Sequence, residues 1–164
     1  IDELLIPALN RVGDDYEKGV IFLPQLISAA EAAKLCFEEV KSRIKGGGIG
    51  KGARVLATVF GAVHDIGKNI VKTVLENYGY NVIDLGKNVP PQTVVEAVKK
   101  GNIRLCGLSA LMTTTVENMK KTIELLRENC PGCKIMVGGA VLTEEYAEKI
   151  GADKYCKDAA ASAR

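Results

Sequence analysis

The chain has 164 residues, of which 47% are hydrophobic and 26% charged, and its 22 basic and 20 acidic residues give a net charge of +2. This length allows one full domain with a smaller appendage and excludes a large multidomain enzyme. Because charges of both signs are mixed along the chain, the clustered basic face of a nucleic-acid-binding protein is not expected, and neither is a nucleic-acid partner.

The sequence also predicts no membrane partner. No apolar run approaches the roughly 20 residues needed to cross a bilayer, and no basic segment with an apolar core marks a secretion signal, so we expect a cytoplasmic protein. Five scattered cysteines fit free thiols. The pair in Cys130-Pro131-Gly132-Cys133 lacks the second CxxC or the histidine pair of a zinc site, which favours a helix-to-strand turn.

Residues 1–45 have a helical pattern. Apolar residues recur at helical spacing from Leu5 to Tyr16 and again from Leu23 to Ala33. The pattern is already under way at Ile1, as expected if a further helix precedes it. Residues 46–52 then contain five glycines, too many for a stable helix or strand. We therefore predict a small helical bundle domain followed by a flexible linker.

Residues 53–164 alternate between short apolar runs and helical stretches. Strands are predicted at 54–60, 81–85, 103–109, 134–138 and, more weakly, 153–156, and helices at 67–78, 91–100, 115–129, 143–150 and from 158 onward. Parallel neighbours require crossover connections, so this order predicts an α/β domain. The expected domain is Rossmann-like (flavodoxin-like), with a five-stranded parallel sheet and helices on both faces. Ligands of such sheets bind beyond the carboxyl ends of the strands.

The single histidine of the chain, His64, follows the first predicted strand, in the loop from Gly61 to Asn69. A neutral imidazole is a common ligand of cobalt-class metals, and Gly67 would permit close approach of a bulky group. A lone histidine is equally often a surface or packing residue. The glycine spacing matches neither GxxxxGK[ST] nor GxGxxG, which argues against a phosphate loop.

The run His64-Asp65-Ile66-Gly67-Lys68-Asn69 closely resembles the second part of the DxHxxG signature of cobalamin-binding domains. Such domains occur in methionine synthase and in the corrinoid proteins of methylamine, methanol and methoxyarene methyltransferase systems. Ser109-Ala110-Leu111 with Thr113 is similar to their SxL region, and Gly138-Gly139-Ala140 is similar to their GG motif. Tyr16 and the run from Gly19 to Gln25 resemble their helical cap. The resemblance covers nearly the whole chain.

The resemblance implies a cobalamin (vitamin B12) cofactor, as methylcobalamin or a Co(I) corrinoid, with His64 as the lower ligand of the cobalt. The dimethylbenzimidazole tail would leave the metal and thread between the sheet and the helices. Tyr16 and Leu23 would shield the methyl face, although bundle packing is an alternative role. The implied cofactor-binding residues are Asp2, Tyr16, Leu23, Gly61, Ala62, Val63, His64, Asp65, Ile66, Gly67, Ser109, Leu111, Thr113, Thr115, Gly138, Gly139 and Ala159.

The small and hydroxylic members of this set would accommodate the tail. Gly67, Gly138 and Gly139 would leave room for it, and the hydroxyls of Ser109 and Thr113 could form hydrogen bonds with it. Tight turns are the alternative role for the glycines, and helix capping is the alternative for the hydroxyls.

Ala62 departs from the family signature, which has aspartate two residues before the histidine. In the resembling proteins that carboxylate accepts a hydrogen bond from the second imidazole nitrogen and raises its basicity, as partners of metal-bound histidines generally do. In the resembling proteins a hydroxyl at the position of Thr115 often completes a relay through that carboxylate, so Thr115 would here lack the carboxylate that connects it to the histidine. Asp65 is adjacent to His64 but is expected to point elsewhere. The alanine at position 62 fits either a natural divergence or a substitution introduced into the protein. We predict weakened ligation by His64.

The function implied is that of a carrier, which shuttles methyl groups between a substrate-specific methyltransferase and a methyl-accepting methyltransferase. A reductive activase is a further candidate partner. No separate catalytic acid, base or nucleophile is predicted. Two other classes remain: a B12-dependent regulatory sensor, which would usually carry a DNA-binding domain, and the cobalamin-binding domain of a mutase, which would lack this cap.

Overall fold

The computed structural model describes residues 4–43 and 52–163. All of the predicted linker except Gly52 lies outside the described residues, as does the start of the chain. No helix within these two ranges is long and apolar enough to cross a bilayer.

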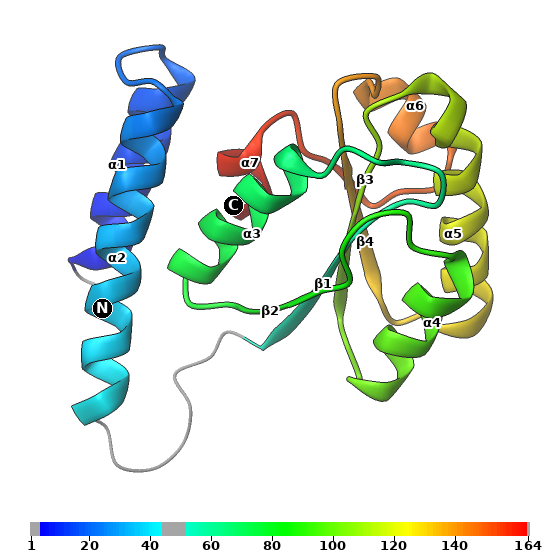
Figure 1. Ribbon diagram of the computed structural model, residues 1–164, viewed down its shortest axis with the longest axis horizontal. Helices are drawn as coiled ribbons and strands as arrows, with labels where there is room; N and C mark the ends of the chain where they lie inside the picture. The colour runs from blue at the N-terminus through cyan, green and yellow to red at the C-terminus, as the bar shows by residue number, and fades with distance from the viewer. Residues whose placement is uncertain (1–3, 44–51, 164) are drawn as a thin grey trace.

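Two helices, α1 (Leu5–Glu17) and α2 (Leu23–Arg43), form a hairpin at the N-terminal side of the molecule (Figure 1). The turn between them requires a left-handed residue, which Gly19 supplies with a φ of 70°. Leu9, Leu26 and Ala33 are buried, as their helical spacing predicts. The predicted helical segment is therefore confirmed, and we call α1 and α2 together the cap.

The rest of the chain is a parallel sheet with helices on both faces (Figure 1), which confirms the predicted fold class. The strand order is β2-β1-β3-β4-β5, and every pairing is parallel. The strands are β1 (Ala53–Thr58), β2 (Asn81–Asp84), β3 (Leu105–Ser109), β4 (Lys134–Gly138) and β5 (Lys154–Tyr155), and the helices are α3 (Ile66–Asn77), α4 (Pro91–Lys100), α5 (Val116–Asn129), α6 (Glu144–Lys149) and α7 (Ala159–Ala163).

The predicted elements differ from these bounds mainly at their ends. Phe60 lies in a turn rather than in the first strand, because β1 stops where the chain bends at Gly61, whose φ is 86°. The third strand begins at Leu105 rather than at residue 103. The helix predicted from residue 115 is preceded by a short 3-10 turn (Thr113–Thr115). The Cys130 to Cys133 segment is a turn between α5 and β4, as predicted, in which the amide of Cys133 donates to the Cys130 carbonyl.

Each face of the sheet packs in a different way. On one face, Val55 and Val137 belong to a large apolar core that includes Val94 of α4 and Ile123 of α5. On the other face, Leu56 and Met136 form a smaller cluster with Leu75 of α3 and with Cys156. The smaller cluster leaves part of this second face uncovered at the carboxyl ends of the strands.

The cap packs on the side of α3 and α7. Leu9 and Ala33 form a cluster with Val74 of α3, Tyr78 and Ala159. The hydroxyl of Tyr78 also donates a hydrogen bond to Oδ1 of Asn10, at 3.1 Å. These contacts place the cap beside the open part of the sheet.

Candidate functional site

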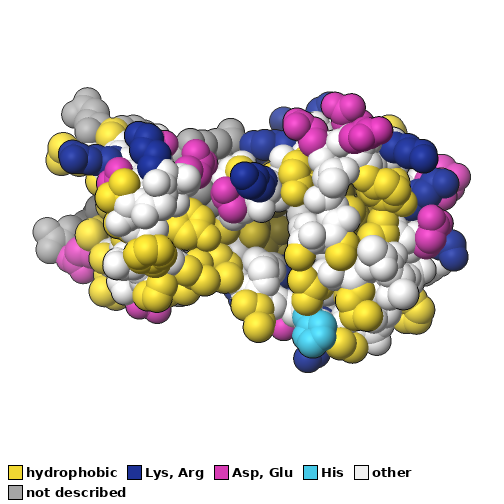
Figure 2. Space-filling model, turned by 90° about the horizontal axis from the view of Figure 1, so that it is seen from above, with side chains coloured by type: hydrophobic (Ala, Val, Ile, Leu, Met, Phe, Trp, Pro, Cys, Tyr) yellow, Lys and Arg dark blue, Asp and Glu magenta, His cyan; other side chains and the backbone are white. Residues whose placement is uncertain are grey.

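A cavity of about 710 Å³ lies where the second face of the sheet, the helices α3 and α7, and the cap meet. Figure 2 shows hydrophobic side chains on both sides of this hollow and the only histidine of the chain on the α/β side. A volume of this size and a mostly apolar lining are typical of cofactor sites. The predicted residues that line the cavity are Tyr16, Leu23, His64, Ile66, Gly67, Ser109, Leu111, Gly138, Gly139 and Ala159.

The remaining predicted residues lie elsewhere. Asp2 is outside the described residues. Gly61, Ala62, Val63 and Asp65 belong to the loop that carries His64 but are not among the lining residues. Thr113 and Thr115 lie in the 3-10 turn beyond β3 and do not line the cavity either.

The imidazole of His64 is exposed between the end of β1 and the start of α3. None of the described residues forms a hydrogen bond with it, and neither Ala62 nor Asp65 supplies an acceptor. Ala62 is itself buried, with 2% of its surface exposed. The imidazole is therefore available to a ligand from the cavity, and its second nitrogen has no fixed protein partner within the described residues.

The glycines of the predicted site fall into two groups. A Cβ atom at Gly67 would meet nothing within 4 Å, so the fold does not require a glycine there. A Cβ at Gly139, by contrast, would lie 1.8 Å from the carbonyl oxygen of Ala110, and the φ of Gly139 is 141°. A Cβ at Gly138 would lie 3.1 Å from the carbonyl of Cys156. Gly138 and Gly139 therefore have a packing role, whereas neither packing nor backbone conformation requires a glycine at position 67.

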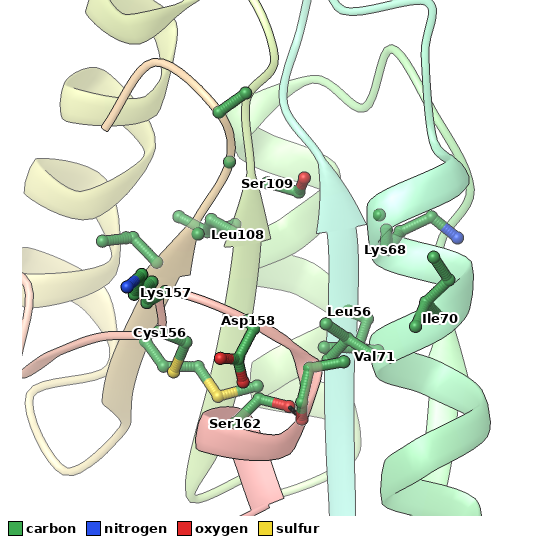
Figure 3. A pocket seen from close by; sticks show the side chains of 18 of the residues that line it. Leu56, Lys68, Ile70, Val71, Leu108, Ser109, Cys156, Lys157, Asp158 and Ser162 are labelled. Carbon is green, nitrogen blue, oxygen red and sulfur yellow. Dashed lines mark hydrogen bonds between the residues drawn. The ribbon is translucent and has the colours of Figure 1, made fainter. Parts of the chain in front are cut away.

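The hydroxyl groups also differ in their surroundings. The side chain of Ser109, at the end of β3, lies beside the end of β1 in Figure 3 and lines the cavity. Thr115 is buried, and its hydroxyl donates to the carbonyl of Met112 at 2.8 Å. Within the described residues, no side chain caps the 3-10 turn or α5, so helix capping, the alternative role for Ser109 and Thr113, is not observed there.

Several lining residues were not predicted. Lys68 extends its nitrogen away from the cavity in Figure 3, and its aliphatic part lines the wall. Lys68 belongs to the run that resembles the cobalamin signature, and Lys157 and Asp158 directly precede Ala159, so position in the motif could have identified these three. The apolar part of the wall carries the same pattern as an ordinary core and gave no signal. It comprises Leu56, Ile70, Val71, Gly107, Leu108, Met136, Val137, Ala140, Tyr155 and Cys156.

The residues present fit a large flat cofactor with a narrow tail. The cavity begins at an unpartnered imidazole, continues past the open space at Gly67, and reaches Ser162 of α7 between apolar walls. A neutral imidazole is a suitable donor for cobalt, and the hydroxyl of Ser109, which lines the cavity, would be available to polar groups of a tail.

Comparison with known proteins gives a consistent result. Residues 52–164 match the model of a B12 binding domain, and residues 1–41 match a second B12 binding domain model. The chain is 42% identical over 163 residues to the dimethylamine corrinoid protein of Methanosarcina barkeri, and the match covers 97% of this chain and 76% of that protein. It is 39% identical over 164 residues to trimethylamine corrinoid protein 1 of Methanosarcina mazei, with the same shares covered.

Solved structures agree. A cobalamin-binding protein from Desulfitobacterium hafniense superposes with a TM-score of 0.84 at 33% identity, over 94% of this chain and 74% of that one. The methanol:cobalamin methyltransferase complex of Methanosarcina barkeri gives a TM-score of 0.83 at 34% identity, over 99% of this chain and 63% of the matched chain.

Proposed function

This chain belongs to the B12-binding domain family, and we propose that it is a corrinoid carrier that holds cobalamin in the cavity and presents a methyl group to partner methyltransferases. The observation that carries this proposal is the cavity itself, which starts at the free imidazole of His64 and is lined by both the sheet and the cap. Similarity to two corrinoid proteins of methylamine systems favours a carrier over a sensor or a mutase domain.

His64 would hold the cobalt from below, and the dimethylbenzimidazole tail would occupy the cavity. Gly67 supports this arrangement, because it leaves open space beside the imidazole that the fold does not need. The hydroxyl of Ser109 would bind polar groups of the tail, and the apolar wall would exclude water from it. When bound, cobalamin supplies the cobalt centre that accepts and releases the methyl group, while the protein supplies position and electronic tuning.

The cap would cover the upper face of the corrin. Tyr16 and Leu23 line the same cavity as His64, although they come from helices at the other end of the chain. Because both side chains face the cavity rather than only the bundle interior, bundle packing does not fully account for them. They would limit access of water to the methyl group until a partner protein binds.

The proposed partners are a substrate-specific methyltransferase and a methyl-accepting methyltransferase, with a reductive activase as a third. Support comes from the structural match to one chain of a methanol:cobalamin methyltransferase complex and from the names of the amine-system relatives.

The single histidine allows a decisive test of this proposal. The protein would be prepared with ¹⁵N-labelled histidine, loaded with cobalamin and reduced to the paramagnetic Co(II) form. Ligation by His64 replaces the triplet splitting of a ¹⁴N ligand with the doublet of ¹⁵N in the electron paramagnetic resonance spectrum. The His64→Gly variant should lose the doublet. Failure of the parent protein to bind cobalamin would refute the carrier function, and a persistent triplet would refute ligation by histidine.

A further inference from the structure

The loop that carries His64 is held by Asn88, a residue distant in sequence. The amide of Gly61 donates a hydrogen bond to Oδ1 of Asn88 at 2.8 Å, and the amide of Asn88 donates to the carbonyl of Ala62 at 3.1 Å. The two bonds form a reciprocal clasp between the loop after β1 and the segment that joins β2 to α4. His64 lies two residues beyond Ala62.

Further contacts fix the residues just before the clasp. Nδ2 of Asn118, in α5, donates to the carbonyl of Phe60 at 2.9 Å. Val59 forms a parallel bridge with Val89, whose amide donates to the carbonyl of Thr58 at 3.0 Å. The backbone leading to His64 is therefore bonded on both sides, and among these contacts that precede the histidine Asn88 supplies the one nearest to it in sequence.

This clasp matters because Ala62 gives the imidazole no side-chain acceptor. Where a carboxylate normally orients a metal-bound histidine, orientation must here come from the backbone that carries it. Gly61, with a φ of 86°, is a point where that backbone would otherwise be free to rotate.

We infer that Asn88 is a positioning residue for His64, which holds the imidazole in the orientation that binds cobalt. This inference rests on the proposed function, since it concerns ligation by His64. Asn88 does not line the cavity, so its effect would act through the loop and not through contact with the cofactor.

A plain turn role is the alternative, because Asn88 has a φ of 55° and asparagine tolerates the left-handed region. Two substitutions separate the roles. Asn88→Gly keeps the backbone conformation but removes the Oδ1 acceptor, whereas Asn88→Asp keeps an acceptor at the same position. Asn102 is a matched control, since within the described residues it is the other non-glycine with positive φ, at 47°, and it follows α4 far from the loop.

The first measurement uses the empty protein. Hydrogen exchange by nuclear magnetic resonance should show faster exchange of the Gly61 amide in Asn88→Gly, near-parent exchange in Asn88→Asp, and no change in Asn102→Gly. The second measurement uses cobalamin-loaded protein. Loss of one hydrogen bond, typically worth about 0.5–1.5 kcal/mol, should raise the Kd of cobalamin about 2- to 13-fold in Asn88→Gly. In the same variant, the fraction of Co(II) centres that show the histidine doublet should fall.

Rescue of both the doublet and the Kd by Asn88→Asp would support positioning by the side chain. Equal behaviour of Asn88→Gly and Asn102→Gly in exchange and in the doublet fraction would overturn the inference. If the parent protein itself bound no cobalamin, or bound it without the doublet, the proposed function would fail instead, and the exchange data would still report on the clasp.

Discussion

The ammonium group of Lys68 lies 2.6 Å from Oδ1 of Asp84, and only 2% of the lysine side chain is exposed. Lys68 also donates to Oδ1 of Asn69, and the amide of Gly86 donates to Asp84. Burial alone would raise the pKa of the Asp84 carboxyl, but the hydrogen bonds from Lys68 and Gly86, with the attraction of Lys68 and Lys72, lower that pKa below its usual value. The pair joins the first turn of α3 to the end of β2 beside the cavity.

The variant Asp84→Asn leaves Lys68 buried without its countercharge, which should cost about 3 kcal/mol of unfolding free energy at pH 7. Because the pKa of Asp84 is lowered by folding, its stabilisation is present above the unfolded value of about 3.9 and is lost as the pH falls through the folded value. Urea titrations of parent and variant should therefore differ most near pH 7 and converge in acid. Cobalamin affinity should also fall, since Lys68 forms part of the cavity wall.

Asp153 is the matched control for that variant. Burial would raise its pKa as well, but hydrogen bonds from Arg127, the Ile135 amide and Lys134 lower it. Asp153→Asn should lose stability with the same dependence on pH yet leave cobalamin affinity unchanged, because Asp153 does not line the cavity. An equal loss of affinity in both variants would contradict a local role for the Lys68 pair.

Ala62→Asp should restore an acceptor for the second nitrogen of His64. Partners of this kind are typically worth about 10- to 100-fold in metal affinity or activity, so a larger fraction of bound cobalamin should carry the histidine ligand. Visible absorption spectra of both proteins across pH measure this fraction. Ala62→Val, which adds bulk at the same buried position without an acceptor, is the control. Indistinguishable spectra for parent and Ala62→Asp would contradict the prediction.

Gly67→Ala and Gly139→Ala should behave in opposite ways. A methyl group at Gly67 meets open space at the start of α3, so the empty protein should be as stable as the parent or up to about 1 kcal/mol more stable. Cobalamin binding should weaken by about 1–3 kcal/mol, because the methyl group occupies space meant for the cofactor. Thermal denaturation and cobalamin titration measure the two effects separately.

At Gly139 the same substitution places a methyl group against the Ala110 carbonyl in a backbone conformation that alanine rarely adopts. Gly139→Ala should therefore unfold at a clearly lower temperature even without cofactor. A stable Gly139→Ala protein with impaired binding would instead assign Gly139 to the cofactor.

The Cys133 thiol of the CxxC segment should react slowly. Burial, with a contribution from Cys130, raises the pKa of the Cys133 thiol to about 11, and burial raises the pKa of Cys106 further. Since the thiolate is the reactive form, iodoacetamide at pH 8 should modify the exposed Cys36 well before Cys133. Mass spectrometry of peptides gives the order, and Cys36→Ser should remove the fast phase. Labelling of Cys133 as rapid as that of Cys36 would reopen a redox role.

The sequence predicted the sheet well because its signals are local. Short runs of apolar residues mark β1, β3 and β4, and the crossover helices between them require a parallel sheet. His64 and Ser109 were also predictable, because His64 lies in the loop after β1, Ser109 ends β3, and both belong to motifs. These strands and residues can be predicted because their signals come from neighbouring residues in the chain.

The remaining features depend on contacts between distant residues. The burial of Lys68 depends on Asp84 in a neighbouring strand, and the clasp at Gly61 depends on the left-handed backbone of Asn88. The role of Gly139 was only partly predicted, since its close approach to Ala110 joins two strands and has no counterpart in the local sequence. A cavity wall such as Leu56 cannot be distinguished from a core by its pattern alone.

The cavity is lined by Tyr16 near one end of the chain and by Ser162 near the other. Any molecule that fills it therefore touches α1 and α7 together, and binds only after both have reached their places. Such a ligand stabilises the folded state by mass action, about 2.7 kcal/mol when its concentration is 100 times its Kd. Binding of the ligand would thus join the cap and the sheet into one cooperative unit. Proteases would then cut the cap of the empty protein faster than the cap of the loaded protein.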